Sequence, residues 1–286
     1  MRAEDCDLSE IASVPLKTSN IGHVGVPVVV AGQEFSLLID TNATYSTLSS
    51  KMIRRLGLSK KSFPDERMIN VGSGLVVAKY VKVDAMEIGA MRLKDHEFGA
   101  IQSELYIPGF DGVLGLDVLL IHDVEFDFAN NTLRIISENH CPGHVVYWTD
   151  DGFAVVPLKP PSFLALNVQG ALDDKPLGVF VDTGVTKSSM NLEYVEQLLG
   201  FNEMSAELAP AEERRTFTYP FKKLAFELLE MRNPQILLLS QKKKSSDPDV
   251  PLWNTNLTLG LDLLRKLHLY IATKEQMLYL TPPALI

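Results

Sequence analysis

The sequence predicts an all-β protein built of two related lobes with short helices, and three observations carry this prediction. The 286-residue chain contains an internal repeat, because two short motifs each recur at nearly the same displacement. Most of its apolar segments are short and bounded by turn residues, which is typical of antiparallel strands. No long helices alternate with these strands, as a parallel sheet would require.

The first repeated motif ends an apolar strand with an aspartate. The segment FSLLIDTNATYSTLS at 35–49 matches LGVFVDTGVTKSSMN at 177–191, so Asp40 and Asp182 lie 142 residues apart. A carboxylate at the end of a buried strand is costly unless something uses it. The match therefore raises the question of what the two aspartates do together.

The second repeated motif supports an ancient duplication. The segment VLGLDVLLIHDVEFDFANNTLRI at 113–135 aligns without gaps to TLGLDLLRKLHLYIATKEQMLYL at 258–280. Asp117 falls on Asp262, and these two lie 145 residues apart. We interpret both as first-turn residues of short helices, where negative charge is favourable, and not as catalytic groups.

Local patterns predict the other strands and the short helices. Hairpins are expected at 26–40, at 67–83 and at 125–135, the last turning at Asn130-Asn131. In the second half, strands at 164–168 and 177–182 are expected around a longer loop, QGALDDKP. Short helices are expected at 49–58 and 191–201, with N-caps and glycine stops at Ser49 or Ser50, Asn191, Gly57 and Gly200.

A segment rich in turn residues, 137–152, predicts the division between the lobes. We expect residues 1–140 to form the N-terminal lobe, which carries the Asp40 motif. Residues 141–286 would form the C-terminal lobe, which carries the Asp182 motif.

Composition limits the classes of partner. The formal net charge is -9, so a basic nucleic-acid-binding surface is not expected. No apolar run approaches the roughly 20 residues that span a bilayer, so no membrane segment is expected. The N-terminus has no apolar stretch typical of a signal peptide. The sequence therefore fits either a cytosolic protein or the mature form of an exported one.

The two cysteines, Cys6 and Cys141, are too few for a disulfide framework, and their spacing does not fit a zinc site. They are either unrelated thiols or one bridge from the N-terminal tail to the middle of the chain, and composition does not separate these alternatives. His140 and His144 lie near Cys141, but we interpret this segment as a turn-rich linker. No metal site is expected.

The paired aspartates predict a chemistry. Two lobes that each offer one aspartate can bring the pair together at a pseudo-twofold axis. Two adjacent carboxylates cannot both ionise cheaply, so they share one proton. The ionised group can activate a water molecule, while the protonated group donates to a scissile carbonyl. This predicts peptide hydrolysis without a cofactor, a metal or a covalent intermediate.

These motifs resemble those of two-lobed, single-chain aspartic proteases of the pepsin/retropepsin superfamily. In that family each lobe supplies Asp-Thr-Gly, and an apolar-apolar-Gly segment passes behind it. The resemblance covers roughly 24–136 and 163–281 and implies the bilobal pepsin-like fold, with two pseudo-twofold-related β-barrel-like lobes. The residues that carry it are LLIDTNA (37–43) with GVLGLD (112–117), and VFVDTGV (179–185) with LTLGLD (257–262).

The resemblance also implies roles for residues. Asp40 and Asp182 would be the catalytic pair of an aspartic endopeptidase. The hairpin at 67–83 would be a flap over a peptide or protein substrate in the cleft between the lobes. Two lobes in one chain make a monomer the expectation. Residues that support the dyad would be Thr41, Asn42, Thr183 and Gly184, and the flap tip would be Gly72, Ser73 and Gly74.

The chain looks most similar to bacterial exported members of this superfamily. These place one cysteine before the first strand and another after the first lobe, as Cys6 and Cys141 are placed. The resemblance implies a Cys6–Cys141 disulfide and a periplasmic or secreted location, because such bridges persist in oxidising compartments. A cytoplasmic location is not excluded.

The first motif departs from the family pattern, because Asn42 stands where the family has glycine. Asparagine tolerates positive φ better than most residues, and it adds a polar side chain beside the dyad. We expect this side chain to take the place of the water or to bond Asp40, and to weaken or retune catalysis. The alternative is a weak or inactive pseudoprotease that binds extended peptides or partner proteins.

Overall fold

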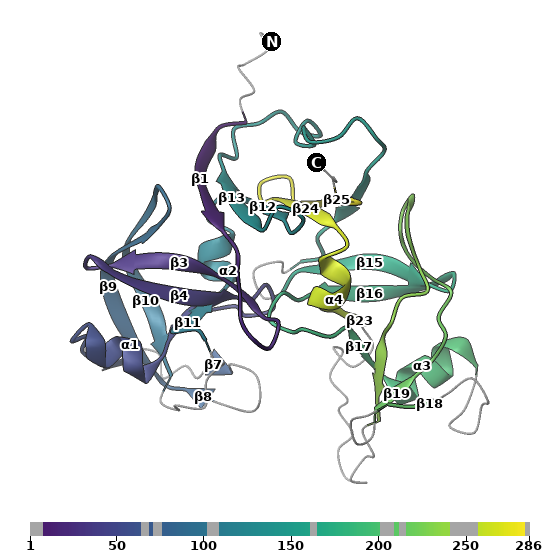
Figure 1. Cartoon of the computed structure of the whole chain (residues 1–286), viewed down its shortest axis with the longest axis horizontal. Helices are drawn as coiled ribbons and strands as arrows, with labels where there is room; N and C mark the ends of the chain where they lie inside the picture. Colours follow the sequence, from purple (N-terminus) through teal and green to yellow (C-terminus); the bar gives the residue numbers. More distant parts are fainter. Residues whose placement is uncertain are drawn as a thin grey trace.

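The computed structural model describes residues 8–63, 69–70, 76–101, 109–160, 165–200, 209–211, 216–240 and 257–283. Within these ranges the chain forms two lobes joined by a sheet that takes strands from both halves (Figure 1). Strands predominate and the helices are short. The predicted all-β class is therefore confirmed.

The first lobe is a closed, barrel-like sheet. Its hairpin β3–β4 turns at Ala31 and Gly32, which have φ of 50° and 72°. β3 also pairs with β9, and this pairing closes the sheet on itself. The strand order is β2 (Lys17–Thr18), β3 (Val24–Val30), β4 (Gln33–Ile39), β11 (Gly112–Leu114), β5 (Thr47–Leu48), β10 (Met91–Ala100), β9 (Lys79–Ile88) and β6 (Lys61–Ser62).

The second lobe forms a nine-stranded sheet. The prediction of a long loop over QGALDDKP is wrong. β15 and β16 both extend into this segment, and only Asp173 and Asp174 lie between them. Both aspartates have positive φ, of 45° and 66°, which gives a tight turn that matches the twist of the strands. The strand order is β18 (Ala209–Pro210), β19 (Thr216–Thr218), β22 (Leu237–Leu239), β17 (Ser189–Asn191), β23 (Leu257–Leu259), β16 (Lys175–Val181), β15 (Asn167–Leu172), β20 (Lys223–Phe226) and β21 (Leu229–Arg232).

A six-stranded sheet joins the two lobes. Its central pair is β12 with β24, which places Phe126 opposite Leu269. Alternate residues of β12 face opposite sides, so Phe126 belongs to the main apolar core while Glu125 lies in a buried polar layer. The order is β1 (Glu10–Pro15), β13 (Thr132–Ile136), β12 (Asp123–Asp127), β24 (His268–Ala272), β25 (Met277–Thr281) and β14 (Ala154–Pro157).

The two longer helices have the N-caps that the sequence predicts. Ser49 Oγ accepts a hydrogen bond from Met52 N at 3.2 Å, and Asn191 Oδ1 accepts one from Tyr194 N at 2.8 Å. Gly200 has a φ of 76° and ends the second of these helices. The helices are α1 (Ser50–Arg55), α2 (Leu116–Leu119), α3 (Leu192–Leu199) and α4 (Leu261–Leu264).

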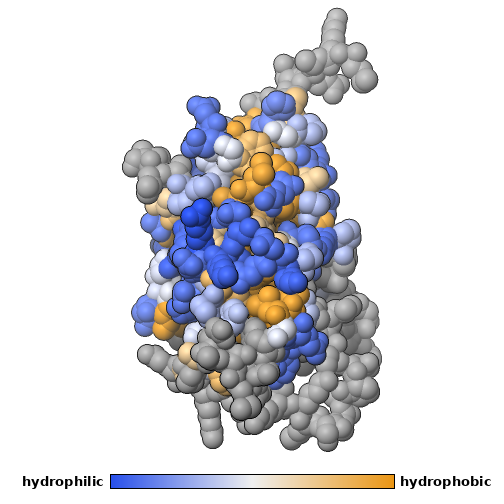
Figure 2. Space-filling view, turned by 90° about the vertical axis from the view of Figure 1, so that its right-hand side faces the viewer, coloured by the Kyte–Doolittle hydropathy of each residue, from blue (hydrophilic) through white to orange (hydrophobic). Residues whose placement is uncertain are grey.

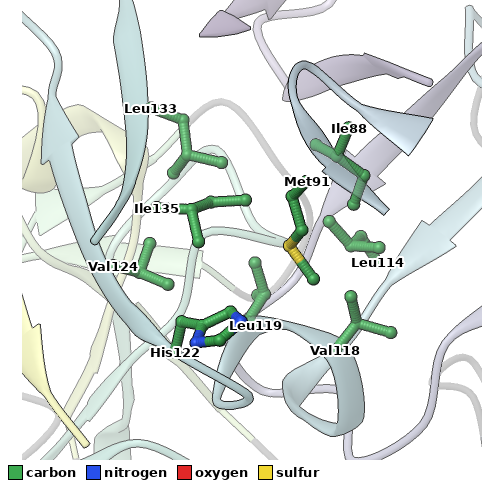
Figure 3. A pocket seen from close by; sticks show the side chains of 9 residues that line it. All are labelled: Ile88, Met91, Leu114, Val118, Leu119, His122, Val124, Leu133 and Ile135. Atoms are coloured by element: carbon green, nitrogen blue, oxygen red, sulfur yellow. The ribbon is translucent and has the colours of Figure 1, made fainter. Parts of the chain in front are cut away.

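A small cavity marks the seam between the first lobe and the six-stranded sheet (Figure 3). Its volume is about 10 Å³, and His122 is the one polar residue of its lining. This is space left by imperfect packing, because an apolar cavity of this size does not hold ordered water. The other lining residues are Ile88, Met91, Leu114, Val118, Leu119, Val124, Leu133 and Ile135.

The face of the molecule on the side of the second lobe is mostly polar. Figure 2 shows hydrophilic residues over much of the described part of this face, with an apolar area in its upper part and smaller ones below. Single apolar side chains such as Leu228, which is 92% exposed, are ordinary on a folded surface. Among the described residues, no helix has the length and apolar character to cross a membrane.

Candidate active site

The two repeated motifs are in contact within each lobe, which explains why both recur. Asp40 follows the last residue of β4, and Asp182 follows the last residue of β16. β11 runs parallel to β4, and β23 runs parallel to β16. Asp40 N donates to Leu114 O at 3.0 Å, and Asp182 N donates to Leu259 O at 3.0 Å. Each aspartate is thus held at its strand end by the apolar segment of the second motif.

A symmetric threonine pair brings the two motifs together. Thr41 N donates to Thr183 Oγ1 at 3.1 Å, and Thr183 N donates to Thr41 Oγ1 at 3.0 Å. Each hydroxyl then donates to a carbonyl of the opposite lobe, Val181 O at 2.5 Å and Ile39 O at 2.9 Å. Both threonines are buried. The four bonds fix the ends of the two aspartate-bearing strands against each other.

Two buried serines that sequence reasoning missed brace the aspartate loops. Ser46 donates to Asp117 Oδ1 from its backbone N at 2.8 Å and from Oγ at 2.7 Å. Ser188 makes the same pair of bonds to Asp262 Oδ1, at 2.9 and 2.7 Å. Asp117 and Asp262 do lie in the first turns of α2 and α4, as predicted. The internal repeat could have identified both serines, because each comes six residues after the aspartate of its motif.

The carboxyl groups of Asp40 and Asp182 share one site at the lobe interface. Asn42 N donates to Asp40 Oδ1 at 2.8 Å, and Gly184 N donates to Asp182 Oδ1 at 2.8 Å. A Cβ placed on Gly184 would lie 2.5 Å from Asp40 Cγ, so the two loops are in close contact. The third residue of each motif thus offers its backbone N–H to its own aspartate.

The side chain of Asn42 does not bond Asp40, as one of the two expectations from the sequence had it. Its amide Nδ2 donates to Asp182 Oδ2 at 3.1 Å, so it bonds the aspartate of the opposite lobe and not Asp40. Asn42 itself is exposed. Its φ is not positive, so a tolerance of left-handed backbone does not explain the asparagine.

Burial raises the pKa of both aspartates. Asp182 is 4% exposed, and burial raises its pKa, to which the charge of Asp40 adds; the result is about 7. Hydrogen bonds from Gly184 N and from the Asn42 side chain oppose this rise. Burial likewise raises the pKa of Asp40, against the hydrogen bonds from Asn42 N and Ala43 N. The pair therefore titrates as one unit that holds a shared proton below neutral pH.

The flap tip and one cysteine lie outside the described residues. These are Gly72, Ser73, Gly74 and Cys6, so the glycine-tipped flap and the Cys6–Cys141 disulfide stay predictions. β7 (Ile69–Asn70) and β8 (Val76–Val77) pair on either side of the tip, which agrees with the predicted hairpin.

One buried cluster has groups of the kind that bind metals. Ligand atoms of Glu125, Asp127 and His268 all lie within 4.8 Å of one another. Arg134 Nη1 donates to Glu125 Oε1 at 2.5 Å and contacts Asp127 Oδ2 at 3.4 Å. A cation would meet this guanidinium, so the cluster fits a buried ion-pair network better than a metal centre.

Comparison with known proteins agrees with this geometry. Residues 26–118 match the family model described as aspartyl protease. The crystal structure of an aspartic proteinase from Irpex lacteus matches with a TM-score of 0.63 at 13% sequence identity, over 94% of this chain and 96% of that chain. No curated protein sequence matches the chain significantly. At this identity the structural match shows a shared fold, and both lobes are part of it.

Proposed function

We propose that this chain, a member of the aspartic protease family with the pepsin-like fold, is an endopeptidase that uses Asp40 and Asp182 as its catalytic pair. The observation that carries the proposal is the shared site of two buried carboxyl groups, one from each lobe. Each accepts a backbone N–H from its own motif. Their raised pKa values suit a pair that keeps one proton, as general acid–base catalysis requires.

The proposed mechanism moves protons between the pair and a water molecule. The ionised carboxylate takes a proton from water as the water oxygen attacks the peptide carbonyl carbon. The protonated carboxyl donates its proton to the carbonyl oxygen, which gives a neutral tetrahedral intermediate. The carbon–nitrogen bond then breaks, a proton passes to the leaving amine, and the dyad is again singly protonated.

Substrate binding is proposed for the cleft between the lobes, with the boundary of the lobes at residue 140. An extended peptide would lie under the hairpin at 67–83 and gain main-chain hydrogen bonds as an added strand does. We expect a monomer, with neither nucleic acid nor membrane as a partner. The disulfide, if formed, would favour the periplasmic or secreted location.

The proposal is tested by digesting proteome-derived peptides from about pH 3 to about pH 8, which spans the carboxylate and histidine pKa values. We expect cleavage that is blocked by pepstatin, an inhibitor that mimics the transition state. Folded protein that cleaves nothing at any pH would contradict the proposal. Peptide binding without turnover would instead support the pseudoprotease.

A further inference from the structure

Asn42 differs from its counterpart in the second lobe because its side chain crosses the lobe interface. Its backbone N–H donates to Asp40 Oδ1 at 2.8 Å, and its amide Nδ2 donates to Asp182 Oδ2 at 3.1 Å. One residue of the first lobe therefore bonds both carboxyl groups. Gly184, at the matching position, contacts Asp182 through its backbone N–H.

The space beside the two carboxyl groups is unequal. A Cβ on Gly184 would lie 2.5 Å from Asp40 Cγ and 2.6 Å from Asp40 Oδ2, so a side chain there would displace the carboxyl group. The first lobe accommodates a carboxamide at the equivalent place, and Asn42 remains exposed. The departure from Asp-Thr-Gly thus falls in the motif that has room for it.

The added hydrogen bond acts on one aspartate only. A donor aimed at a carboxylate oxygen stabilises the ionised form more than the neutral form. The Asn42 amide accordingly lowers the pKa of Asp182, in opposition to burial and to the charge of Asp40, which raise it. Asp182 therefore ionises more easily than it would beside a second glycine.

We propose that Asn42 is a positioning residue that fixes Asp182 Oδ2 and sets the alkaline limit of hydrolysis. The inference rests on the proposed function, because that limit is reached when the dyad loses its shared proton. With Asn42 present, the proton is lost at a lower pH than in a dyad with glycine in both motifs. Asn42 thus retunes the pH range of the enzyme and leaves both carboxyl groups in place.

A titration that needs no turnover tests the inference first. Carbon-13 NMR of the aspartate carboxyl groups would follow Asp182 in the wild type, Asn42→Ala and Asn42→Gly, with the signal assigned by Asp182→Asn. We expect the midpoint of Asp182 to rise by about one pH unit in both Asn42 variants, which corresponds to about 1.4 kcal/mol. Alanine fits the backbone here because φ is not positive. An unchanged midpoint in the folded variants would overturn the inference.

The pH dependence of kcat gives the second readout. The alkaline limb should move upward by the same amount in both Asn42 variants, with less change in KM. Asn130→Ala is the matched control, because Asn130 Nδ2 donates to Asp127 Oδ2 at 2.9 Å in the turn between β12 and β13. A limb that stays in place in the Asn42 variants, or that moves equally in the control, would contradict the inference. A wild type that cleaves nothing would contradict the proposed function, and the titration would still decide the role of Asn42.

Discussion

Thr41 and Thr183 exchange hydrogen bonds across the lobe interface, and each hydroxyl both accepts and donates. Each accepts the backbone N–H of the other threonine, at 3.1 and 3.0 Å, and each donates to a carbonyl of the opposite lobe. The exchange fixes the residue that follows each aspartate. The separation of the two carboxyl groups therefore depends on buried bonds that lie beneath them.

Replacing Thr41 by valine should loosen this exchange. In Thr41→Val the backbone N of Thr183 and the carbonyl of Val181 lose their partners while they stay buried. Each such loss costs about 1–3 kcal/mol, so we expect the free energy of unfolding to fall by about 2–6 kcal/mol in denaturant titration. Thr132→Val is the control, since its hydroxyl makes a local, exposed bond at 3.1 Å. Equal losses in the two variants would contradict this account.

Adding one methyl group at Gly184 should disable the site. The new Cβ would lie 2.5 Å from Asp40 Cγ, so the carboxyl group must move. A displacement of about 1 Å in a catalytic group costs on the order of 100-fold, so kcat should fall at least that much. Gly152→Ala, where a Cβ meets nothing within 4 Å, should keep wild-type kcat. Steady-state kinetics that show normal kcat in Gly184→Ala would refute the proposed geometry.

The linker depends on a buried histidine. His140 Nε2 lies 2.5 Å from Asp123 Oδ2, and its Nδ1 lies 3.2 Å from Glu275 Oε1. Because Asp123 is fully buried, His140→Leu removes one hydrogen-bond partner of its carboxylate, which costs about 1–3 kcal/mol. His144→Leu, on an exposed position of the same linker, should cost less than about 0.5 kcal/mol. Thermal unfolding of both variants measures this difference in stability. Equal Tm values would contradict a stabilising role for His140.

Asp182 should make the stability of the fold depend on pH. Its folded-state pKa of about 7 exceeds the unfolded value of about 3.9, so the folded state holds its proton more tightly. The contribution of this group is fully present below about pH 4 and is lost as pH rises to about 7. Asp182→Asn lacks this titration, so its Tm relative to wild type should increase by roughly 5 °C between about pH 4 and about pH 8. A constant difference in Tm across this range would contradict the raised pKa.

The paired aspartates could be predicted because the duplication places the same aspartate motif in both halves of the chain. Asp40 alone would pass for a residue that caps a turn, and only its match to Asp182 indicates a shared site. Ser46 and Ser188 carry the same signal and could have been found in the same way. Local patterns also sufficed for the helix N-caps at Ser49 and Asn191, since capping depends on residues three apart.

The sheet that joins the lobes could not be predicted from local patterns. A strand pattern shows that Phe126 is buried, but it does not show that Leu269 lies opposite. The partners of His140 could not be predicted either. Asp123 and Glu275 flank its ring, but the turn-rich sequence around it does not indicate these contacts. The Asn42 bond to Asp182 likewise depends on how the lobes meet, which the first motif by itself does not specify.

The central claim is that Asp40 and Asp182 act as one catalytic unit. The most direct measurement is kcat on the best-cleaved peptide for Asp40→Asn, Asp182→Asn and the double variant, each shown to be folded. Residues that act as a unit are strongly non-additive, so each single variant should lose as much activity as the double variant. A single variant that keeps near-wild-type kcat, or two losses that simply multiply in the double variant, would contradict the shared dyad.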